Sequence, residues 1–277
     1  MEVSGILDKL ALKDNYEEGD YVVDGLLYCG KCHTKKQTRV HPLGEERIVV
    51  CTCQCKREAQ EKEEAERKQR DEFEAIRRLR VTGFANSEML GWTFSKDDGM
   101  DTKLSKAARR YVENWNKVYS DNIGLLLFGP VGTGKTFFAA CIVNALIDKN
   151  IPCLMTNFAR ISMDMQSDFE GRRDYIDNIM KYKLLVIDDL AAERKTEYMD
   201  EVVQTVIDAR YRTGKPLIVT TNLTKDELTN PSDMTKKRTY SRLFEMCHPI
   251  EVTGYDRRKV KLRNNYNDTN RLLGLDE

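Results

Sequence analysis

A glycine-rich run of eight residues constrains the fold of this chain more than any other feature. Residues 129–136 read GPVGTGKT and fit the pattern G-x-x-x-x-G-K-[ST]. The apolar run at 123–128 before it has the length of a strand, and the apolar run at 137–146 after it suits a buried helix. A strand, a glycine loop and a helix in this order form a phosphate-binding unit, whereas a chance glycine turn lacks these flanks. The sequence therefore predicts an α/β fold with a nucleotide site.

Each residue type in the loop suits a bound triphosphate. Glycine has no Cβ and adopts unusual dihedral angles, so backbone N–H groups can surround the phosphates. The following helix directs the positive end of its dipole at them. We expect Lys135 to reach the β- and γ-phosphates and the Thr136 hydroxyl to bind Mg²⁺. The predicted nucleotide-binding residues are Gly129, Pro130, Val131, Gly132, Thr133, Gly134, Lys135 and Thr136.

Composition excludes several classes of protein. The 277 residues suffice for one large domain and a smaller one. Lys and Arg total 45 and Asp and Glu total 45, so any contact with nucleic acid must use a local basic patch. No apolar run approaches the roughly 18 residues of a membrane span, and the first thirty residues lack the apolar core of a signal peptide. We therefore expect a cytoplasmic protein with no membrane contact, whose cysteines are metal ligands or buried thiols.

Five of the eight cysteines lie close together near the N-terminus. They are Cys29, Cys32, Cys51, Cys53 and Cys55. Segments 38–40 and 47–50, between the two groups, can form a hairpin that brings the groups together. Four thiolates in a tetrahedron are a preferred site for Zn²⁺, and a segment this short cannot build its own apolar core. The sequence therefore predicts a small zinc module.

Zinc requires only four of these five thiolates. The favoured set is Cys29, Cys32, Cys53 and Cys55, because a helix-forming run begins directly after it. Cys51 remains an alternative to either member of the second pair, and His33 and His41 are weaker candidates. The competing interpretation is a group of free thiols, which is disfavoured because exposed free cysteines are reactive.

The composition along the chain divides it into four predicted segments. These are an N-terminal segment at 1–27 with a possible short helix at 6–12, the zinc module at 28–56, a charged helix and linker at 57–99, and the α/β domain at 100–277. The charged helix carries intermixed signs, so we interpret it as a solvated spacer, with a partner-binding helix as the alternative. Four apolar residues of the linker, Phe84, Leu90, Trp92 and Phe94, are expected to pack on the domain that follows, where a helix is predicted over about 103–119.

Two further strands end in polar side chains. The run KLLVIDD at 183–189 ends in two carboxylates, and PLIVTTN at 216–222 ends in an amide. The carboxyl ends of parallel strands meet at one edge of the sheet, where ligands bind. We expect Asp188 to hold Mg²⁺ directly or through water, Asp189 to polarise the attacking water, and Asn222 to reach the γ-phosphate or that water.

An arginine follows in a helical stretch beyond that strand. Arg242 lies within 239–245, and a guanidinium there can project into the nucleotide of a neighbouring subunit as an arginine finger. The alternative is an ordinary surface salt bridge.

Residues from about 84 to 258 resemble the AAA+ ATPases of the DnaC/DnaI helicase-loader family, bacterial or phage. The resemblance rests on GPVGTGKT at 129–136, VIDDLAAERKTEY at 186–198, TTN at 220–222 and SRL at 241–243, with Glu193 in the most specific part. It implies an AAA+ core with a five-stranded parallel sheet, preceded by the zinc module and the helical linker. It also implies that Asn222 is the first sensor, that Arg242 is the finger and that Arg257 or Arg258 is a second sensor. It further implies a compact ending with no helical lid after Arg258. Ala191 stands where the family usually has glycine, with little expected consequence.

The resemblance implies an ATP-dependent loader that binds the hexameric replicative helicase and helps to place it on single-stranded DNA. Its cofactors would be ATP or ADP, Mg²⁺ and Zn²⁺, its ATPase domains would self-associate, and its hydrolysis would be weak and regulated by partner or DNA. Arg160, Arg172 and Arg173 are candidate DNA contacts. The alternatives are a transposition helper ATPase of the IstB type and a metal-stabilised adaptor with a vestigial ATPase site.

Overall fold

The computed structural model describes residues 15–99, 101–167, 171–191, 196–231 and 233–275. The chain divides into two compact units, Met1–Phe73 and Glu74–Glu277, which are described separately below. The possible short helix at 6–12 and the predicted Glu193 lie outside the described residues.

The N-terminal unit consists of two small hairpins and the start of a helix. Strand β1 (Tyr21–Val23) pairs with β2 (Leu26–Tyr28), and β3 (Gln37–Val40) pairs with β4 (Arg47–Val50), both antiparallel, with a 3-10 turn η1 (Pro42–Gly44) between β3 and β4. The β3–β4 pair is the hairpin expected between the cysteine groups, and this prediction is confirmed. Every residue of β4 is exposed, so the hairpin contributes no apolar core.

Helix α2 (Gln54–Thr82) leads from the first unit to the second and has no fully buried side chain. Residues 83–99, here called the strap, connect it to α3 through the 3-10 turns η2 (Ser87–Gly91) and η3 (Phe94–Lys96). The strap packs on the rest of the second unit: Phe84 bridges to Met155, and Leu90, Trp92 and Phe94 contact the core. The predicted ordered linker is therefore confirmed.

The second unit is built on one five-stranded sheet. The strands are β5 (Gly124–Phe128), β6 (Cys153–Asn157), β7 (Leu184–Leu190), β8 (Leu217–Thr221) and β9 (Cys247–Glu251). They lie in the order β6-β7-β8-β5-β9, and each described pairing is parallel, as expected for continuous apolar runs. The predicted α/β fold with a five-stranded parallel sheet is confirmed.

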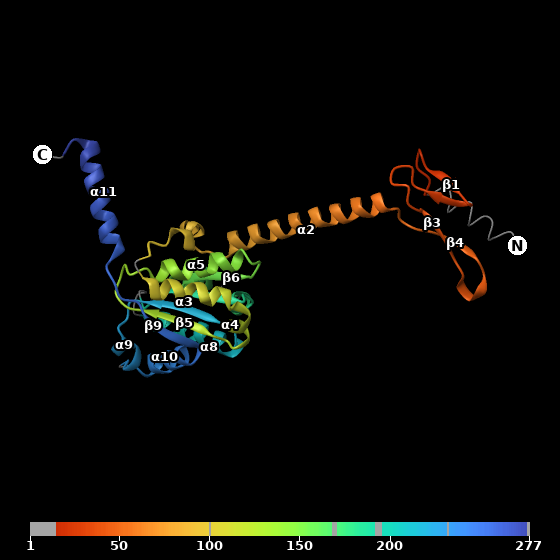
Figure 1. The fold of residues 1–277 in the computed structure, drawn as a ribbon. Coiled ribbons are helices and arrows are strands. Elements are labelled where there is room, and N and C mark those ends of the chain that lie inside the picture. Colours follow the sequence, from red (N-terminus) through yellow and green to blue (C-terminus); the bar gives the residue numbers. More distant parts are fainter. Residues whose placement is uncertain (1–14, 100, 168–170, 192–195, 232, 276–277) are drawn as a thin grey trace. The chain divides into compact units, whose positions relative to one another are not determined.

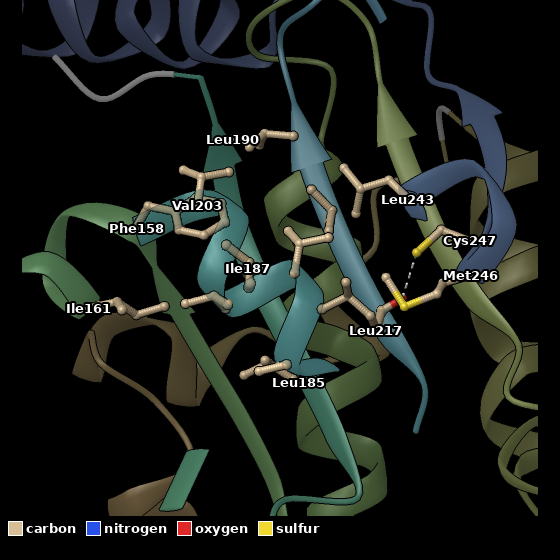
Figure 2. Packing of buried hydrophobic residues seen from close by; sticks show 14 of the residues in the cluster. Phe158, Ile161, Leu185, Ile187, Leu190, Val203, Leu217, Leu243, Met246 and Cys247 are labelled. Atoms are coloured by element: carbon tan, nitrogen blue, oxygen red, sulfur yellow. Dashed lines mark hydrogen bonds between the residues drawn. The ribbon is translucent and has the colours of Figure 1, made fainter. Parts of the chain in front are cut away.

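Helices cover both faces of this sheet. One face is covered by α3 (Thr102–Glu113), α4 (Trp115–Ser120) and α5 (Lys135–Ile147), and the other by α6 (Phe158–Ser167), α7 (Arg172–Met180), α8 (Glu197–Thr213) and α10 (Met234–Met246). An apolar core lies on each face of the sheet. Alternate residues of β5 belong to the two cores, with Leu125 and Leu127 in one and Leu126 and Phe128 in the other. Figure 2 shows the second face, where Leu185, Ile187 and Leu217 pack against helical side chains.

Two sequence expectations differ from the structure. The helix predicted over about 103–119 is broken at Asn114 into α3 and α4, because Asn114 takes a non-helical conformation between them. The expected compact ending after Arg258 is wrong, because helix α11 (Arg257–Leu273) follows there. A short helix α9 (Lys225–Thr229) completes the described elements. None of the described helices is both long enough and apolar enough to cross a membrane.

Candidate nucleotide site and cysteine cluster

The glycine loop connects β5 to α5 as the sequence predicts. Gly132 and Gly134 have φ of 80° and 100°, in the left-handed region that a side chain disfavours. A Cβ on Gly132 would collide with the side chain of Asp256, and one on Gly134 would collide with the guanidinium of Arg257. The left-handed φ favours glycine at both positions, and at Gly132 the backbone and side chain of Asp256 also leave no room for a Cβ. Its last glycine caps α5, whose free N–H groups suit an anion.

Lys135, the first residue of α5, has a buried side chain that folds back onto the loop. Its Nζ donates hydrogen bonds to the carbonyl oxygens of Gly129 at 2.8 Å and Pro130 at 2.7 Å. Burial lowers the pKa of Lys135, while the carboxylates of Asp189 and Asp188 act in the opposite direction. The ammonium is therefore held beside the loop by carbonyl groups that phosphate oxygens can replace.

Asp188 lies buried at the end of β7. Its Oδ1 accepts a hydrogen bond from the Thr220 hydroxyl at 2.6 Å, and the Thr136 hydroxyl also bonds to it. Burial raises the pKa of Asp188, and the Thr220 hydrogen bond partly offsets this. A buried carboxylate next to a hydroxyl is the pair of oxygen ligands expected for Mg²⁺, so the residues present fit this ion.

Asp189 follows Asp188 at a point where the strand is irregular. The pairing of β7 with β8 shifts register between Ile187 and Leu190, and Asp189 has a φ of 56°. Its N–H donates to the Thr220 hydroxyl at 2.9 Å, so one threonine side chain contacts both aspartates. The irregularity leaves Asp188 buried and places Asp189 at the nucleotide cavity.

A cavity of about 460 Å³ lies at this edge of the sheet. Its lining consists of Trp92, Lys96, Asp98, Val131, Gly132, Gly134, Lys135, Thr136, Phe137, Asp189, Asn222, Arg257 and Arg258. The cavity thus brings together five of the eight predicted loop residues, Asp189, Asn222 and both candidate second-sensor arginines. A volume of this size and mixed polarity suits a nucleotide.

The strap carries no nucleotide-binding motif in its sequence, yet Trp92 and Asp98 of the strap line the cavity. The Trp92 ring lies 6.2 Å from the Phe137 ring, and the buried Asn144 amide donates to the carbonyls of Met89 and Trp92, both at 2.9 Å. Asn144 therefore ties the strap to α5. An isolated Asn within an apolar helix was the available signal, and its partners, more than 50 residues away, could not be read from the sequence.

Arg242 lies away from this cavity on α10. It pairs with Asp208 of α8, and its guanidinium lies 5.8 Å from the Tyr211 ring. It does not line the cavity of its own chain, so a role in a neighbour's site stays a prediction. The predicted DNA contacts also have partners within the chain: Arg160 pairs with Asp164 at 3.1 Å, and Arg172 donates to the Met165 carbonyl at 3.0 Å.

Four cysteines of the N-terminal unit converge. The Sγ atoms of Cys29, Cys32, Cys53 and Cys55 all lie within 4.8 Å of one another, and those of Cys29 and Cys53 are each 3.5 Å from that of Cys55. Zinc–sulfur bonds of about 2.3 Å in a tetrahedron place sulfurs about 3.8 Å apart, so this donor set fits Zn²⁺. These are the four favoured ligands. The fifth thiol, of Cys51, donates instead to the Lys35 carbonyl at 3.3 Å, and His33 bonds to Tyr21.

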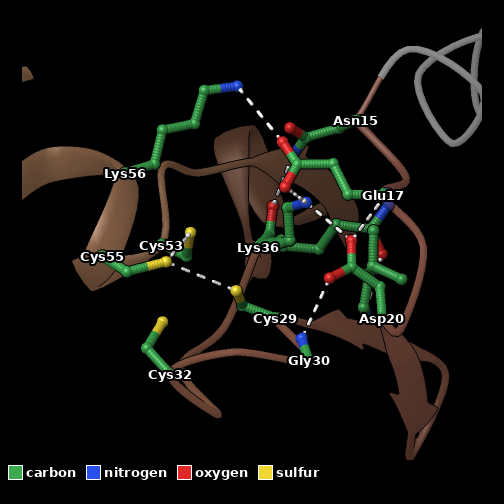
Figure 3. Close-up of polar contacts among 12 residues, drawn as sticks. Asn15, Glu17, Asp20, Cys29, Gly30, Cys32, Lys36, Cys53, Cys55 and Lys56 are labelled. Atoms are coloured by element: carbon green, nitrogen blue, oxygen red, sulfur yellow. Dashed lines mark hydrogen bonds and ion pairs between the residues drawn. The ribbon is translucent and has the colours of Figure 1, made fainter. Parts of the chain in front are cut away.

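A buried ion pair lies beside the cysteine cluster (Figure 3). Lys36 Nζ is 2.6 Å from Asp20 Oδ2, and both side chains are about 98–99% buried. The other oxygen of Asp20 accepts the N–H of Gly30 at 3.0 Å, within the first cysteine pair. Burial alone would raise the pKa of Asp20, but the hydrogen bonds from Lys36, Glu17 and Gly30 lower it to about 2. Gly30 is required for space, since a Cβ there would collide with the Gly19 backbone.

Comparisons with known proteins agree with these motifs. The family described as IstB-like ATP binding protein matches residues 57–265. The replicative helicase loader DnaI of Bacillus subtilis (strain 168) is 25% identical over 190 residues, which are 63% of this chain and 61% of DnaI. The replicative helicase loader DnaC of Escherichia coli (strain K12) is 29% identical over 137 residues, which are 48% of this chain and 54% of DnaC. The chain thus spans less than two thirds of these curated relatives.

Solved structures show the same core. A crystal structure of DnaI matches with a TM-score of 0.53 at 26% identity, covering 65% of this chain and 99% of that chain. A crystal structure of the DnaC helicase loader matches with a TM-score of 0.53 at 20% identity and shares the fold. The family match covers well over half of the sequence, and the cavity holds the nucleotide motifs of that family. The chain therefore belongs to the IstB-like ATP-binding protein family and has an AAA+ domain of the helicase-loader type.

Proposed function

We propose that the chain is an ATP-dependent loader that binds the replicative DNA helicase and helps to place it on single-stranded DNA. The observation that carries this proposal is the cavity at the sheet edge, which gathers Lys135, Thr136, Asp189 and Asn222 in a chain whose relatives include named helicase loaders. A cavity built around a triphosphate loop suits a nucleotide-controlled switch.

Each residue of the cavity has a defined task in this proposal. Lys135 and the N–H groups of the loop would hold the β- and γ-phosphates, and Thr136 and Asp188 would hold Mg²⁺, which would neutralise charge on those phosphates. Asp189 and Asn222 orient the attacking water. Aspartate is one methylene shorter than the glutamate that many ATPases use, so Asp189 reaches less far and turnover is slow. Arg242 of one subunit completes the site of its neighbour.

In this proposal the N-terminal unit binds the helicase. Cys29, Cys32, Cys53 and Cys55 would hold Zn²⁺, which would stabilise a unit that has few buried apolar residues. ATP binding favours self-association and contact with single-stranded DNA, and hydrolysis releases the helicase.

A size-resolved mixture of the full-length chain with the replicative helicase of its host tests the proposal. We expect a complex that contains both proteins, and we expect it to dissociate when ATP and single-stranded DNA are added. A Cys29→Ser variant, which removes one ligand of the cluster, should not form the complex. Absence of any complex with the metal-loaded wild-type chain would reject the loader.

The family description also favours one competitor, a transposition helper ATPase of the IstB type. The cysteine unit counts against it, and a parallel mixture with a transposase in place of the helicase separates the two. An adaptor with a vestigial site is tested by measuring ATP hydrolysis with and without single-stranded DNA, since a vestigial site hydrolyses no ATP in either condition.

A further inference from the structure

Helix α11 begins at the nucleotide cavity. The backbone N–H of Arg257, in its first turn, donates to the Gly132 carbonyl of the phosphate loop at 3.0 Å, and Arg257 Nε is 3.0 Å from Asp98 Oδ2 of the strap. Arg257 and Arg258 both line the cavity. A change in the loop or the strap on nucleotide binding therefore acts directly on the start of α11.

The rest of α11 has little packing of its own. After Arg258, none of its described side chains is buried, and the exposed fractions of Leu262 and Tyr266 are 73% and 65%. Tyr255, just before the helix, is 85% exposed. A helix of 17 residues whose described side chains after Arg258 are all unburied gains little stability from propensity alone, so this surface suits a partner.

The charge of α11 indicates the kind of partner. Its sequence holds six Arg or Lys residues and one Asp, whereas the whole chain carries 45 residues of each sign. This is the local basic patch that a chain with zero net charge needs in order to bind a polyanion. Lys259 is exposed on it.

The other residues of α11 distinguish between polyanions. The sequence of α11 contains four asparagines, at 264, 265, 267 and 270, whereas a helix that lies in a membrane surface needs a continuous apolar face. Exposed tyrosines next to basic residues are the combination on which unpaired bases stack. We propose that α11, with Tyr255, binds single-stranded DNA, and that the bond between Arg257 and the phosphate loop links this binding to the nucleotide. The inference deepens the proposed function, on which it rests for the choice of DNA.

Fluorescence anisotropy of the full-length chain with a labelled oligothymidine of about 30 nucleotides tests the inference. Replacing Tyr266→Ala removes a stacking surface and should weaken binding about tenfold. Replacing Lys259→Gln should reduce the salt slope of log affinity by about 0.7, the value for one phosphate contact on a single strand. The matched controls are Tyr16→Ala and Lys103→Gln, which remove exposed residues of the same types elsewhere and should change neither quantity. Affinity should also differ between ATP and ADP.

Two results would overturn the inference. One is wild-type affinity in both α11 variants, and the other is loss of binding to anionic phospholipid vesicles in these variants with no loss on DNA. Complex formation with the helicase is measured on the same preparations. If the complex forms while the α11 variants bind DNA normally, only this inference fails. If no complex forms with any preparation, the loader is rejected, and the DNA measurements still decide the role of α11.

Discussion

Each unit of this protein buries a carboxylate, and the two surroundings act on it in opposite ways. Asp20 of the N-terminal unit is paired with Lys36 and accepts backbone N–H groups, which lower its pKa to about 2. Asp188 of the second unit (Glu74–Glu277, called the ATPase unit below after its AAA+ domain) accepts hydrogen bonds from hydroxyl groups, and burial raises its pKa. The charge on Asp20 is neutralised by Lys36, whereas Asp188 has no ion-pair partner among the described residues and so fits a metal ion. A structural carboxylate and a ligand carboxylate are thus distinguished by what already neutralises them.

The same contrast extends to the stability of the units. The ATPase unit has two apolar clusters, one on each face of its sheet. The N-terminal unit has few buried apolar residues and concentrates thiols and charges in its interior. We expect metal and ion pairs to dominate in the first unit and apolar packing in the second.

Removal of metal should give the largest difference between the units. A structural zinc contributes on the order of 10 kcal/mol to a small domain, so Cys29→Ser or a strong chelator should unfold the N-terminal unit and leave the ATPase unit folded. Hydrogen exchange of the full-length chain reports the two units separately, and mass spectrometry counts the metal. The matched control is Cys51→Ser, whose thiol lies outside the four-sulfur set and should leave metal content unchanged. Equal metal loss in both variants would contradict the assignment.

Breaking the buried ion pair should have the next largest effect. Replacing Lys36→Met leaves the Asp20 carboxylate buried without its cation, which costs about 3–5 kcal/mol. Exchange of the backbone N–H at position 36, which donates to the Leu27 carbonyl, should accelerate accordingly. Lys56→Met removes an exposed cation 3.9 Å from Glu17 and should cost less than about 0.5 kcal/mol. A similar loss of stability in the Lys36→Met and Lys56→Met variants would contradict the distinction between the buried and the exposed ion pair.

Replacement of Asp188 should change stability in the opposite direction. Asp188→Asn keeps an acceptor for the Thr220 hydroxyl and removes a buried charge, so the nucleotide-free ATPase unit should gain on the order of 1 kcal/mol. The same variant should lose the rise in Tm that Mg²⁺ with ATP produces in the wild-type chain. Calorimetry with and without nucleotide measures both effects. A less stable nucleotide-free variant would show that Asp188 is structural like Asp20.

Two glycine–alanine substitutions in the ATPase unit should have the smallest effects on its free energy of unfolding. Ala191 has a φ of 70°, so Ala191→Gly should stabilise the unit by about 1 kcal/mol by removing left-handed strain. Gly214 ends α8 with a φ of 58° and has open space around it, so Gly214→Ala should destabilise by about the same amount. Urea unfolding monitored in the ATPase unit measures both. If both substitutions change the free energy of unfolding in the same direction, the conformational explanation is contradicted.

Local patterns predicted most of the fold and part of the site. The loop at 129–136, the strand that ends at Asp188 and the hairpin between the cysteine pairs all follow from spacing and hydrophobic runs. Thr220, Asn144 and Asp98 were missed because their roles depend on contacts between segments far apart in the sequence. Helix α11 was missed because it lacks an apolar face, which is the usual signal of a helix in a globular domain.

The release of helicase onto single-stranded DNA tests the central claim most directly. The rate is measured with preformed complexes of helicase with the wild-type chain and with a Lys135→Ala variant, in the presence of ATP. Lys135 is the cation held inside the phosphate loop, so we predict that the variant forms the complex but releases the helicase at least tenfold more slowly. Release at the wild-type rate would contradict the claim that the nucleotide site controls the partner.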